Sequence, residues 1–145
     1  MSIKTIIIFW VVSLSCNYLL ALPKCNGDFS RHCFANINHK NGERYVGEVK
    51  NYKYEGKGTY LYVNGNVYEG DNVNGESHGK GTYTWANGGV YEGDFVDGQR
   101  TGKGILTLAD GSVSGGDFVD GKKHGKGFSR HPTNGASYEG DYVAG

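Results

Sequence analysis

The feature that most constrains this chain is an internal repeat with a period of 23 residues. The segment Tyr68–Asp71 has the sequence Tyr-Glu-Gly-Asp, which recurs at Tyr91–Asp94 and Tyr138–Asp141 and in altered form at Tyr45–Glu48 and Ser114–Asp117. The copies start at residues 45, 68, 91, 114 and 138, so the steps between them are 23, 23, 23 and 24 residues. A fixed period of this length is typical of repeat architectures, in which each unit packs mainly against its neighbours.

Each repeat is predicted to form a β-hairpin. In the third copy, the strand Tyr91–Val96 leads into Asp97-Gly98, and the strand Gly102–Leu108 leads into Asp110-Gly111. Asn-Gly and Asp-Gly pairs accept positive φ angles and favour tight hairpin turns. The predicted fold class is therefore all-β, with the hairpins stacked into a single elongated antiparallel meander.

Glycine makes up 25 of the 145 residues, about 17%, against roughly 7% in average proteins. Alternation along a strand predicts that Tyr91, Gly93 and Phe95 share one face. The second strand of the preceding repeat is expected to place four residues on one face: Gly79, Gly81, Tyr83 and Trp85. Since glycine has no Cβ, both glycines of each Gly-x-Gly pair are expected to let aromatic rings pack directly on the backbone, at about 1.5–3 kcal/mol for each buried ring.

The composition argues against several classes of protein. Fifteen Lys and Arg residues balance fifteen Asp and Glu residues, so the basic excess that nucleic-acid binding requires is lacking and no nucleic-acid partner is expected. The glycine content argues against a helical bundle, and only two prolines argue against collagen. Zero net charge together with 11 Tyr, 6 Phe and 2 Trp argues against disorder.

Residues 1–22 are predicted to be a signal peptide or an N-terminal anchor. Lys4 is followed by an almost wholly apolar stretch over 5–14, and cleavage could occur before Cys16 or after Ala21. A cleaved signal implies a secreted, periplasmic or extracellular protein. The alternatives are a membrane anchor, because residues 5–22 reach the lower length limit for crossing a bilayer, and a lipoprotein acylated at Cys16.

Cys25 and Cys33 remain as a pair if Cys16 is removed with the leader. In an oxidising compartment they are predicted to form one disulfide. The alternative is a zinc site completed by His32 and His39, but the spacing provides only weak support for it.

Taken together, the repeated pattern Tyr-Glu-Gly-Asp-Phe-x-Asp/Asn-Gly-x-x-x-Gly-Lys-Gly closely resembles the MORN (membrane occupation and recognition nexus) repeat. On this resemblance the chain divides into a disulfide loop plus a degenerate half-repeat over 23–44, followed by repeats over 45–67, 68–90, 91–113 and 114–137, and a partial copy over 138–145. Two departures stand out. Tyr52 replaces the turn glycine of the first copy, and Ser114-Gly115 replaces Tyr-Glu in the fourth copy, which is expected to be the least stable.

No residue is expected to be catalytic, to hold a cofactor or to bind a metal, so the chain is predicted not to be an enzyme. The segment Gly75–Gly81 superficially resembles a phosphate loop but has the wrong spacing. His78 and His124 occupy the same repeat position, about 19 Å apart, which is too far to share one metal ion. Carboxylates and lysines recur in every copy, and cross-strand ion pairs explain them better than acid–base catalysis. An abnormally high pKa in one of these carboxylates would favour a small hydrolase instead.

The resemblance implies a role in attachment or regulation, so the expected function is that of an exported scaffold that binds a protein or cell-envelope partner through its sheet. The alternative is peripheral binding of anionic phospholipid headgroups, which the lack of clustered Lys and Arg makes less favourable. Both terminal strands are expected to expose unpaired edges, which favours a homodimer or an edge-docked partner through residues 138–143. The aromatic residues expected to meet the partner are Tyr68, Tyr83, Trp85, Tyr91, Phe95, Tyr138 and Tyr142.

Overall fold

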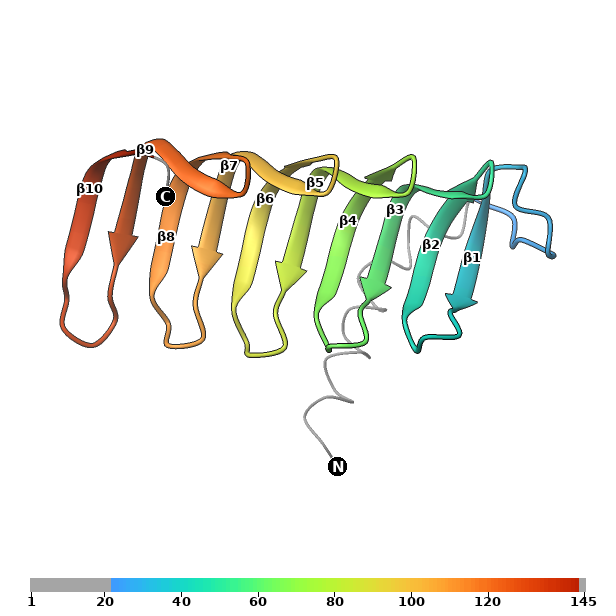
Figure 1. Ribbon diagram of the computed structural model, residues 1–145, viewed down its shortest axis with the longest axis horizontal. Coiled ribbons are helices and arrows are strands. Elements are labelled where there is room, and N and C mark those ends of the chain that lie inside the picture. Colours follow the sequence, from blue (N-terminus) through green and yellow to red (C-terminus); the bar gives the residue numbers. More distant parts are fainter. Residues whose placement is uncertain (1–21, 144–145) are drawn as a thin grey trace, which may run out of the picture.

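A computed structural model describes residues 22–143, which form one antiparallel sheet of ten strands (Figure 1). Every strand pairs with the strands next to it in the sequence, so the predicted all-β meander of hairpins is confirmed. No described residue belongs to a helix that could cross a membrane, and the predicted leader lies outside the described residues except for Leu22. The strands are β1 (Cys33–Asn38), β2 (Arg44–Lys50), β3 (Lys53–Leu61), β4 (Val67–Val73), β5 (Glu76–Thr84), β6 (Val90–Val96), β7 (Gln99–Thr107), β8 (Val113–Val119), β9 (Lys122–Arg130) and β10 (Ser137–Tyr142).

The turns follow from the Asn-Gly and Asp-Gly pairs. Between β4 and β5, Asn74 and Gly75 have φ angles of 55° and 98°, and two positive φ angles in a two-residue loop are typical of a type I′ turn. Tyr52 takes the same position as Gly75 with a φ of 61°. Its N–H donates to the carbonyl of Phe29 at 2.9 Å, and the two rings meet edge to face with centroids 6.2 Å apart. These contacts offset the cost of a left-handed conformation at a bulky residue.

Each of the four repeats also contains a β-bulge, which corrects the expectation for the first glycine of each Gly-x-Gly pair. The pairing of β4 with β5 shifts between Gly70 and Asp71, and the bulge resets the alternation of faces along β5. Gly79 has a φ of 61°, and a Cβ there would lie 3.1 Å from the Asp71 carboxylate rather than against a ring. The expectation that Gly79 seats an aromatic side chain is therefore wrong, whereas Gly81 confirms it because its Cβ would lie 2.6 Å from Cε2 of Tyr68.

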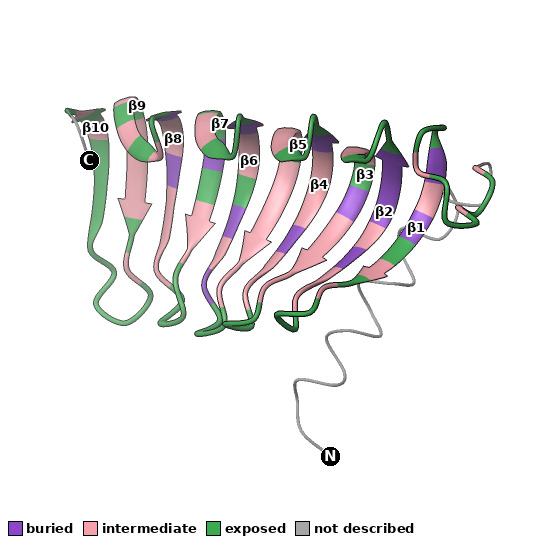
Figure 2. Cartoon of the chain, turned by 45° about the vertical axis from the view of Figure 1, so that its right-hand side comes forward, coloured by how far each residue is buried: buried purple, intermediate pink, exposed green. Residues whose placement is uncertain are grey.

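The core consists of tyrosine rings that lie along their own strands. Tyr45, Tyr68 and Tyr91 expose 0%, 2% and 0% of their surface. The hydroxyl of Tyr68 donates to the carbonyl of Asp71 at 2.6 Å, beside the bulge where regular pairing is lost. The buried residues form two clusters, one on β1–β2 and one on β4, β6 and β8. Figure 2 shows that exposure increases toward β10.

The fourth repeat has a different packing, because Ser114 replaces the leading tyrosine. Tyr142 from β10 approaches the seat that the missing ring would use, since a Cβ on Gly127 would lie 3.1 Å from its Cε2. On the opposite face, Phe128 packs over Gly115, where a Cβ would lie 2.7 Å from Cε1 of the ring. The substitution of Glu by glycine in this copy thus makes room for a ring on the other side of the sheet.

The two edges of the sheet differ. Cys25 and Cys33 form a disulfide with an S–S distance of 2.08 Å, as predicted. Beside this bond, the N–H of Cys25 donates to the carbonyl of Phe34 and the N–H of Phe34 donates to the carbonyl of Pro23, so the segment 23–25 pairs with β1. The expectation that both terminal edges are unpaired is therefore wrong for β1. Among the described residues, β10 pairs only with β9.

Candidate functional site

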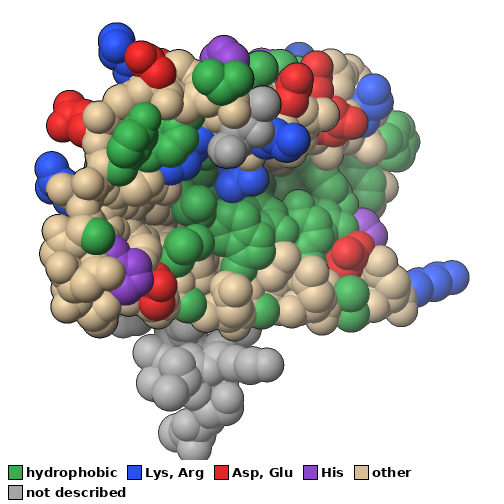
Figure 3. All heavy atoms as spheres, turned by 60° about the vertical axis from the view of Figure 1, so that its left-hand side comes forward, with side chains coloured by type: hydrophobic (Ala, Val, Ile, Leu, Met, Phe, Trp, Pro, Cys, Tyr) green, Lys and Arg blue, Asp and Glu red, His purple; other side chains and the backbone are tan. Residues whose placement is uncertain are grey.

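The face of the sheet that carries the tyrosine rings is hollowed. Figure 3 shows hydrophobic side chains gathered in this hollow, with Lys and Arg side chains beside them. We call this surface the aromatic groove and define it by six half-buried residues: Tyr60, Tyr62, Tyr83, Trp85, Arg100 and Lys123.

Four rings form a continuous row in the aromatic groove. The ring centroids of Tyr60 and Tyr62 lie 4.7 Å apart, and those of Tyr62 and Tyr83 lie 5.9 Å apart. The row ends at Trp85, which meets Tyr83 edge to face at 5.0 Å. Because these rings pack over the buried tyrosines and remain partly exposed, they offer a rigid apolar surface to a ligand.

Hydrogen bonds fix the orientation of several rings. The hydroxyl of Tyr60 donates to Oε2 of Glu43 at 2.8 Å, and the side-chain amide of Asn66 donates to the hydroxyl of Tyr83 at 2.8 Å. Burial raises the pKa of Tyr60, and the hydrogen bonds from Asn41 and Tyr60 lower the pKa of Glu43. The row is therefore held in place before any partner binds, which reduces the entropic cost of binding.

The seven aromatic residues predicted to meet a partner all lie on the groove face but differ in exposure. Tyr68, Tyr91 and Phe95 expose 2%, 0% and 3% of their surface, so they form the core beneath the groove. Tyr83, Trp85 and Tyr142 are half-buried, and Tyr138 is 51% exposed. Only these four present accessible ring surface to a partner.

Sequence reasoning missed Tyr60, Tyr62, Arg100 and Lys123 as groove residues. The signal was present in the repeat itself, because Tyr60 occupies the same repeat position as Tyr83 and Tyr62 the same as Trp85. The two cations occupy a position that faces the groove at the start of the second strand of each hairpin. Aligning all copies by repeat position would have identified the four residues.

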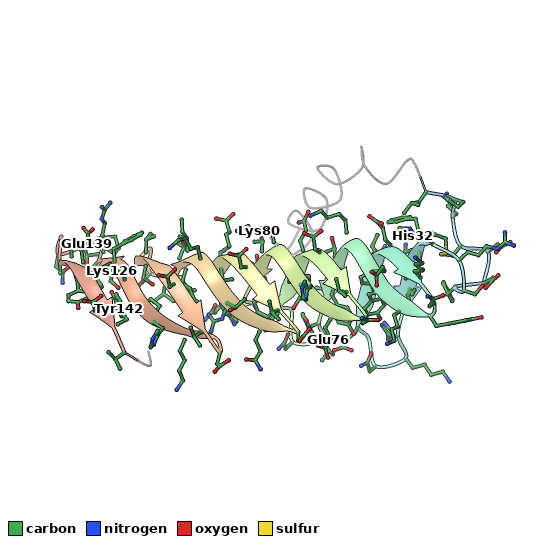
Figure 4. The ribbon with its side chains drawn as sticks, turned by 90° about the horizontal axis from the view of Figure 1, so that it is seen from above. His32, Glu76, Lys80, Lys126, Glu139 and Tyr142 are labelled. Carbon is green, nitrogen blue, oxygen red and sulfur yellow. A yellow bond between two sulfur atoms is a disulfide. The ribbon has the colours of Figure 1, made fainter. Side chains whose placement is uncertain are left out.

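The opposite face carries the predicted ion pairs. Each Asp of the repeat pairs with the lysine directly across from it: Lys57 with Asp71 at 2.6 Å, Lys80 with Asp94 at 2.5 Å, Lys103 with Asp117 at 2.8 Å and Lys126 with Asp141 at 3.3 Å. The hydrogen bond from Lys80 lowers the pKa of Asp94. In the first repeat, His32 lies 2.9 Å from Glu48 instead. Figure 4 shows His32 at one end of the row of strands and Lys126 and Tyr142 at the other.

Among the other polar side chains, Glu69 and His78 lie in distinctive surroundings. Burial raises the pKa of Glu69, which lies directly across from Thr59 and Thr82 in the sheet rather than from a second carboxylate. Within residues 22–143, no three His, Cys, Asp or Glu side chains are grouped so that they could hold a metal ion. Nδ1 of His78 lies 3.7 Å from the carboxylate of Asp97. Among residues 22–143, Glu69 therefore has no carboxylate directly across from it in the sheet.

Comparison with protein families settles the classification. The family model for the MORN repeat matches residues 45–67, 68–90, 91–113 and 116–135. The chain belongs to the MORN-repeat family. The fourth match begins after Ser114-Gly115, the departure from the MORN pattern. MORN repeats are in general non-catalytic modules that mediate protein or membrane interactions.

Other comparisons add little to this MORN assignment. No curated protein matches the chain. Among solved structures, the TCP domain of SAS-4 (dCPAP) of Drosophila melanogaster, in complex with a proline-rich motif of Ana2 (dSTIL), matches over 81% of each chain, with 15% identity and a TM-score of 0.27. A likeness this slight supports no conclusion about the groove.

Proposed function

We propose that this chain is an exported, non-enzymatic scaffold that binds an extended segment of a partner protein along the aromatic groove. The observation that carries the proposal is the continuous row from Tyr60 to Trp85, whose rings remain partly exposed on a hollowed face. A sheet usually buries its apolar face against a second layer. Within the described residues this sheet has no second layer, so the groove face is suited to bind one from a partner.

An extended peptide fits the dimensions of this surface. The groove crosses the strands from β3 to β9, six strand spacings or roughly 29 Å at about 4.8 Å each. About nine residues of extended chain cover that length at about 3.3 Å each. Apolar side chains of such a segment would contact the rings. Because hydrogen bonds of the tyrosine hydroxyls already hold these rings in place, little side-chain entropy would be lost on binding.

Selection from a display library of random peptides about ten residues long tests this function. Selected peptides, labelled with fluorescein, are titrated with the chain and followed by anisotropy. We expect Tyr62→Ser and Tyr83→Ser each to weaken binding about tenfold, since each removes an aromatic contact of about 1–2 kcal/mol. Ile105→Ser on the opposite face, where Ile105 is 46% exposed, is the matched control and should leave affinity unchanged. The groove is not the site if the folded chain selects no peptides or if all three variants behave alike.

Anionic phospholipid is the alternative ligand. The four repeat lysines of the opposite face are paired with aspartates, which makes that face a poor surface for anionic headgroups. Co-sedimentation with phosphatidylserine vesicles distinguishes the two ligands. If the chain binds these vesicles, if added salt abolishes that binding, and if the chain selects no peptides, the lipid function is favoured.

Export is part of the proposal and is supported by the disulfide, because disulfides persist mainly in oxidising compartments. N-terminal sequencing of the chain recovered from its native compartment tests it. A new N-terminus at Cys16 or Leu22 indicates cleavage, a lipid-modified Cys16 indicates a lipoprotein, and an intact Met1 in the membrane fraction indicates an anchor. An intact Met1 in the cytosol would contradict export.

We also propose that β10 mediates a homodimer by pairing with β10 of a second copy. Its outer edge has no partner among the described residues, and Tyr138 and Val143 beside it are 51% and 83% exposed. Sedimentation over a range of concentrations should show a monomer–dimer equilibrium that Tyr138→Lys and Val143→Lys shift toward monomer. Val119→Lys, at a 49% exposed position of β8, is the control. A monomer at all concentrations would refute the dimer.

A further inference from the structure

Arg100 and Lys123 differ from the four repeat lysines, because their side chains face the aromatic groove and not the opposite face of the sheet. They occupy the repeat position that holds Tyr54 in the first copy and Ser77 in the second, so only the third and fourth copies present a cation to the groove. Both side chains are half-buried. Among residues 22–143, neither forms an ion pair, whereas all four repeat lysines of the opposite face do.

The guanidinium of Arg100 is held over three aromatic rings of the groove face. Its guanidinium carbon lies 5.5 Å from the ring centroid of Trp85, 5.4 Å from that of Tyr91 and 5.9 Å from that of Phe118. One N–H donates to the carbonyl of Gly121 at 2.7 Å. Since a guanidinium has five N–H donors in a fixed fork, Arg100 is positioned with donors to spare for a carboxylate.

Lys123 is held in a similar way one repeat further along. Its ammonium lies 3.9 Å from the ring centroid of Tyr142 and donates to Oγ of Ser129 at 2.9 Å. The hydroxyls of Ser129 and Tyr142 are themselves hydrogen-bonded at 2.7 Å. An ammonium has three donors, so Lys123 also keeps hydrogen-bonding capacity for an anion.

We infer that Arg100 and Lys123 read two acidic side chains of the bound segment, and that this segment carries Asp or Glu at two positions three residues apart. The inference rests on the proposed function and specifies its ligand. The two cations lie on strands β7 and β9, two strand spacings or about 9.6 Å apart. In an extended segment of polyproline II conformation, side chains three residues apart lie on the same side and about 9.3 Å apart, which matches this spacing. The apolar residues of the segment then contact Trp85 and the tyrosines beyond it.

The peptides selected by the folded chain test this inference directly. We expect them to be enriched in acidic residues three positions apart, next to apolar residues. Arg100→Gln and Lys123→Gln should each weaken the binding of these peptides about tenfold, because each removes a charge-assisted hydrogen bond, and selection with either variant should require only one acidic residue. Lys103→Gln, which removes the same charge from the opposite face, is the matched control and should bind as the unmodified chain does.

The outcomes separate the two proposals. Selected peptides without paired acidic residues, or equal binding by all three variants, would overturn the acidic-segment inference while the groove remains a peptide site. If the chain has the circular dichroism spectrum of a folded β protein and still selects no peptide, both the acidic-segment inference and the proposed peptide site are wrong. If the chain binds phosphatidylserine vesicles and both Arg100→Gln and Lys123→Gln abolish that binding, the two cations bind a lipid headgroup. This result would overturn the peptide ligand.

Discussion

At the scale of single residues, glycine and tyrosine work as matched partners. The ring of Tyr68 occupies the space that a Cβ on Gly81 would fill, and its hydroxyl bonds to the Asp71 carbonyl. Gly79, two residues before Gly81, serves another purpose, because its φ of 61° forms the bulge that brings the Asp71 carboxylate over it. The alternation of residues along the strand predicted that Gly81 seats a ring. It assigned the same role to Gly79, because the alternation pattern does not reveal a β-bulge.

A substitution at the tyrosine seat should be costly. Gly81→Ala places a Cβ 2.6 Å from Cε2 of Tyr68, and we expect the free energy of unfolding to fall by about 1–3 kcal/mol, as for other overpacked cores. Gly75→Ala is the comparison, because nothing lies within 4 Å of a Cβ there, so its loss reports only the backbone strain of a side chain at a φ of 98°. Urea denaturation measures both variants. Because Gly81 is not among the glycines with a positive φ, an unchanged free energy of unfolding in Gly81→Ala would show that the ring of Tyr68 does not require glycine there.

The buried tyrosines should make the chain sensitive to alkali. Burial raises the pKa of Tyr45 and of Tyr68 above the ordinary value of 10.0. Tyrosine in the unfolded chain ionises at about pH 10, whereas the buried tyrosines stay neutral to a higher pH. The stability that these neutral tyrosines contribute is therefore fully present below about pH 10 and is lost as the pH rises above it. Tyr45→Phe should cost about 1 kcal/mol at neutral pH through the lost hydrogen bond to Glu48 and should flatten the decline above about pH 10. Urea denaturation across this range measures it, and an unchanged decline would contradict the assignment.

At the scale of elements, the repeats differ in how completely they satisfy their own pattern. The hydroxyls of Tyr45, Tyr68, Tyr91 and Tyr138 each donate to the carbonyl three residues ahead. Ser114 is too short to do so. The fourth hairpin therefore relies on Tyr142 from the next strand and on Phe128 from the opposite face.

Amide hydrogen exchange should be fastest in the fourth hairpin and the strand beyond it. We expect β8, β9 and β10 to exchange at least about tenfold faster than β4–β7, because loss of a buried ring and of its hydrogen bond costs more than about 1.4 kcal/mol. Mass spectrometry of proteolytic fragments measures the rates. Uniform protection from β4 to β9 would show that Tyr142 and Phe128 fully replace the missing ring.

The disulfide should stabilise the first strand by holding the segment 23–25 on its edge. Replacing both Cys25 and Cys33 with serine should lower the free energy of unfolding by about 2–3 kcal/mol, as for other short disulfide loops. The amide of Phe34, which donates to Pro23, should lose its protection from exchange. Reducing agent should reproduce both effects in the unmodified chain and leave the double variant unchanged. Retained protection of Phe34 would show that this segment pairs without the disulfide.

At the scale of the whole molecule, the sheet is a linear array whose strands pair only with their neighbours in order. Its buried residues form two separate clusters, one around Tyr45 and Val49 and one around Tyr68 and Phe95. Stability in such an array is a sum of local units and the interfaces between them. The groove runs across several of these units, so binding should couple them.

Unfolding should therefore separate into two steps when one cluster is weakened. Tyr45→Ala removes a fully buried ring from the first cluster, and we expect the circular dichroism transition to begin at lower urea than the fluorescence transition of Trp85, which packs on the second cluster. Trp10→Phe in the background leaves Trp85 as the only tryptophan. Coincident transitions would indicate a single cooperative unit.

The sequence by itself determined the period, the hairpins, their order and the disulfide, because turns such as Asn74-Gly75 and pairs such as Lys80 with Asp94 depend only on residues close in the chain or one strand away. Only the tertiary structure decided which rings are core and which line the groove. Tyr68 and Tyr83 lie on the same face, yet Tyr68 is buried and Tyr83 half-exposed. The ring of Tyr68 is buried because it lies on Gly81 and is covered by Phe95 and the rings of the groove, and these contacts join several strands rather than any one repeat.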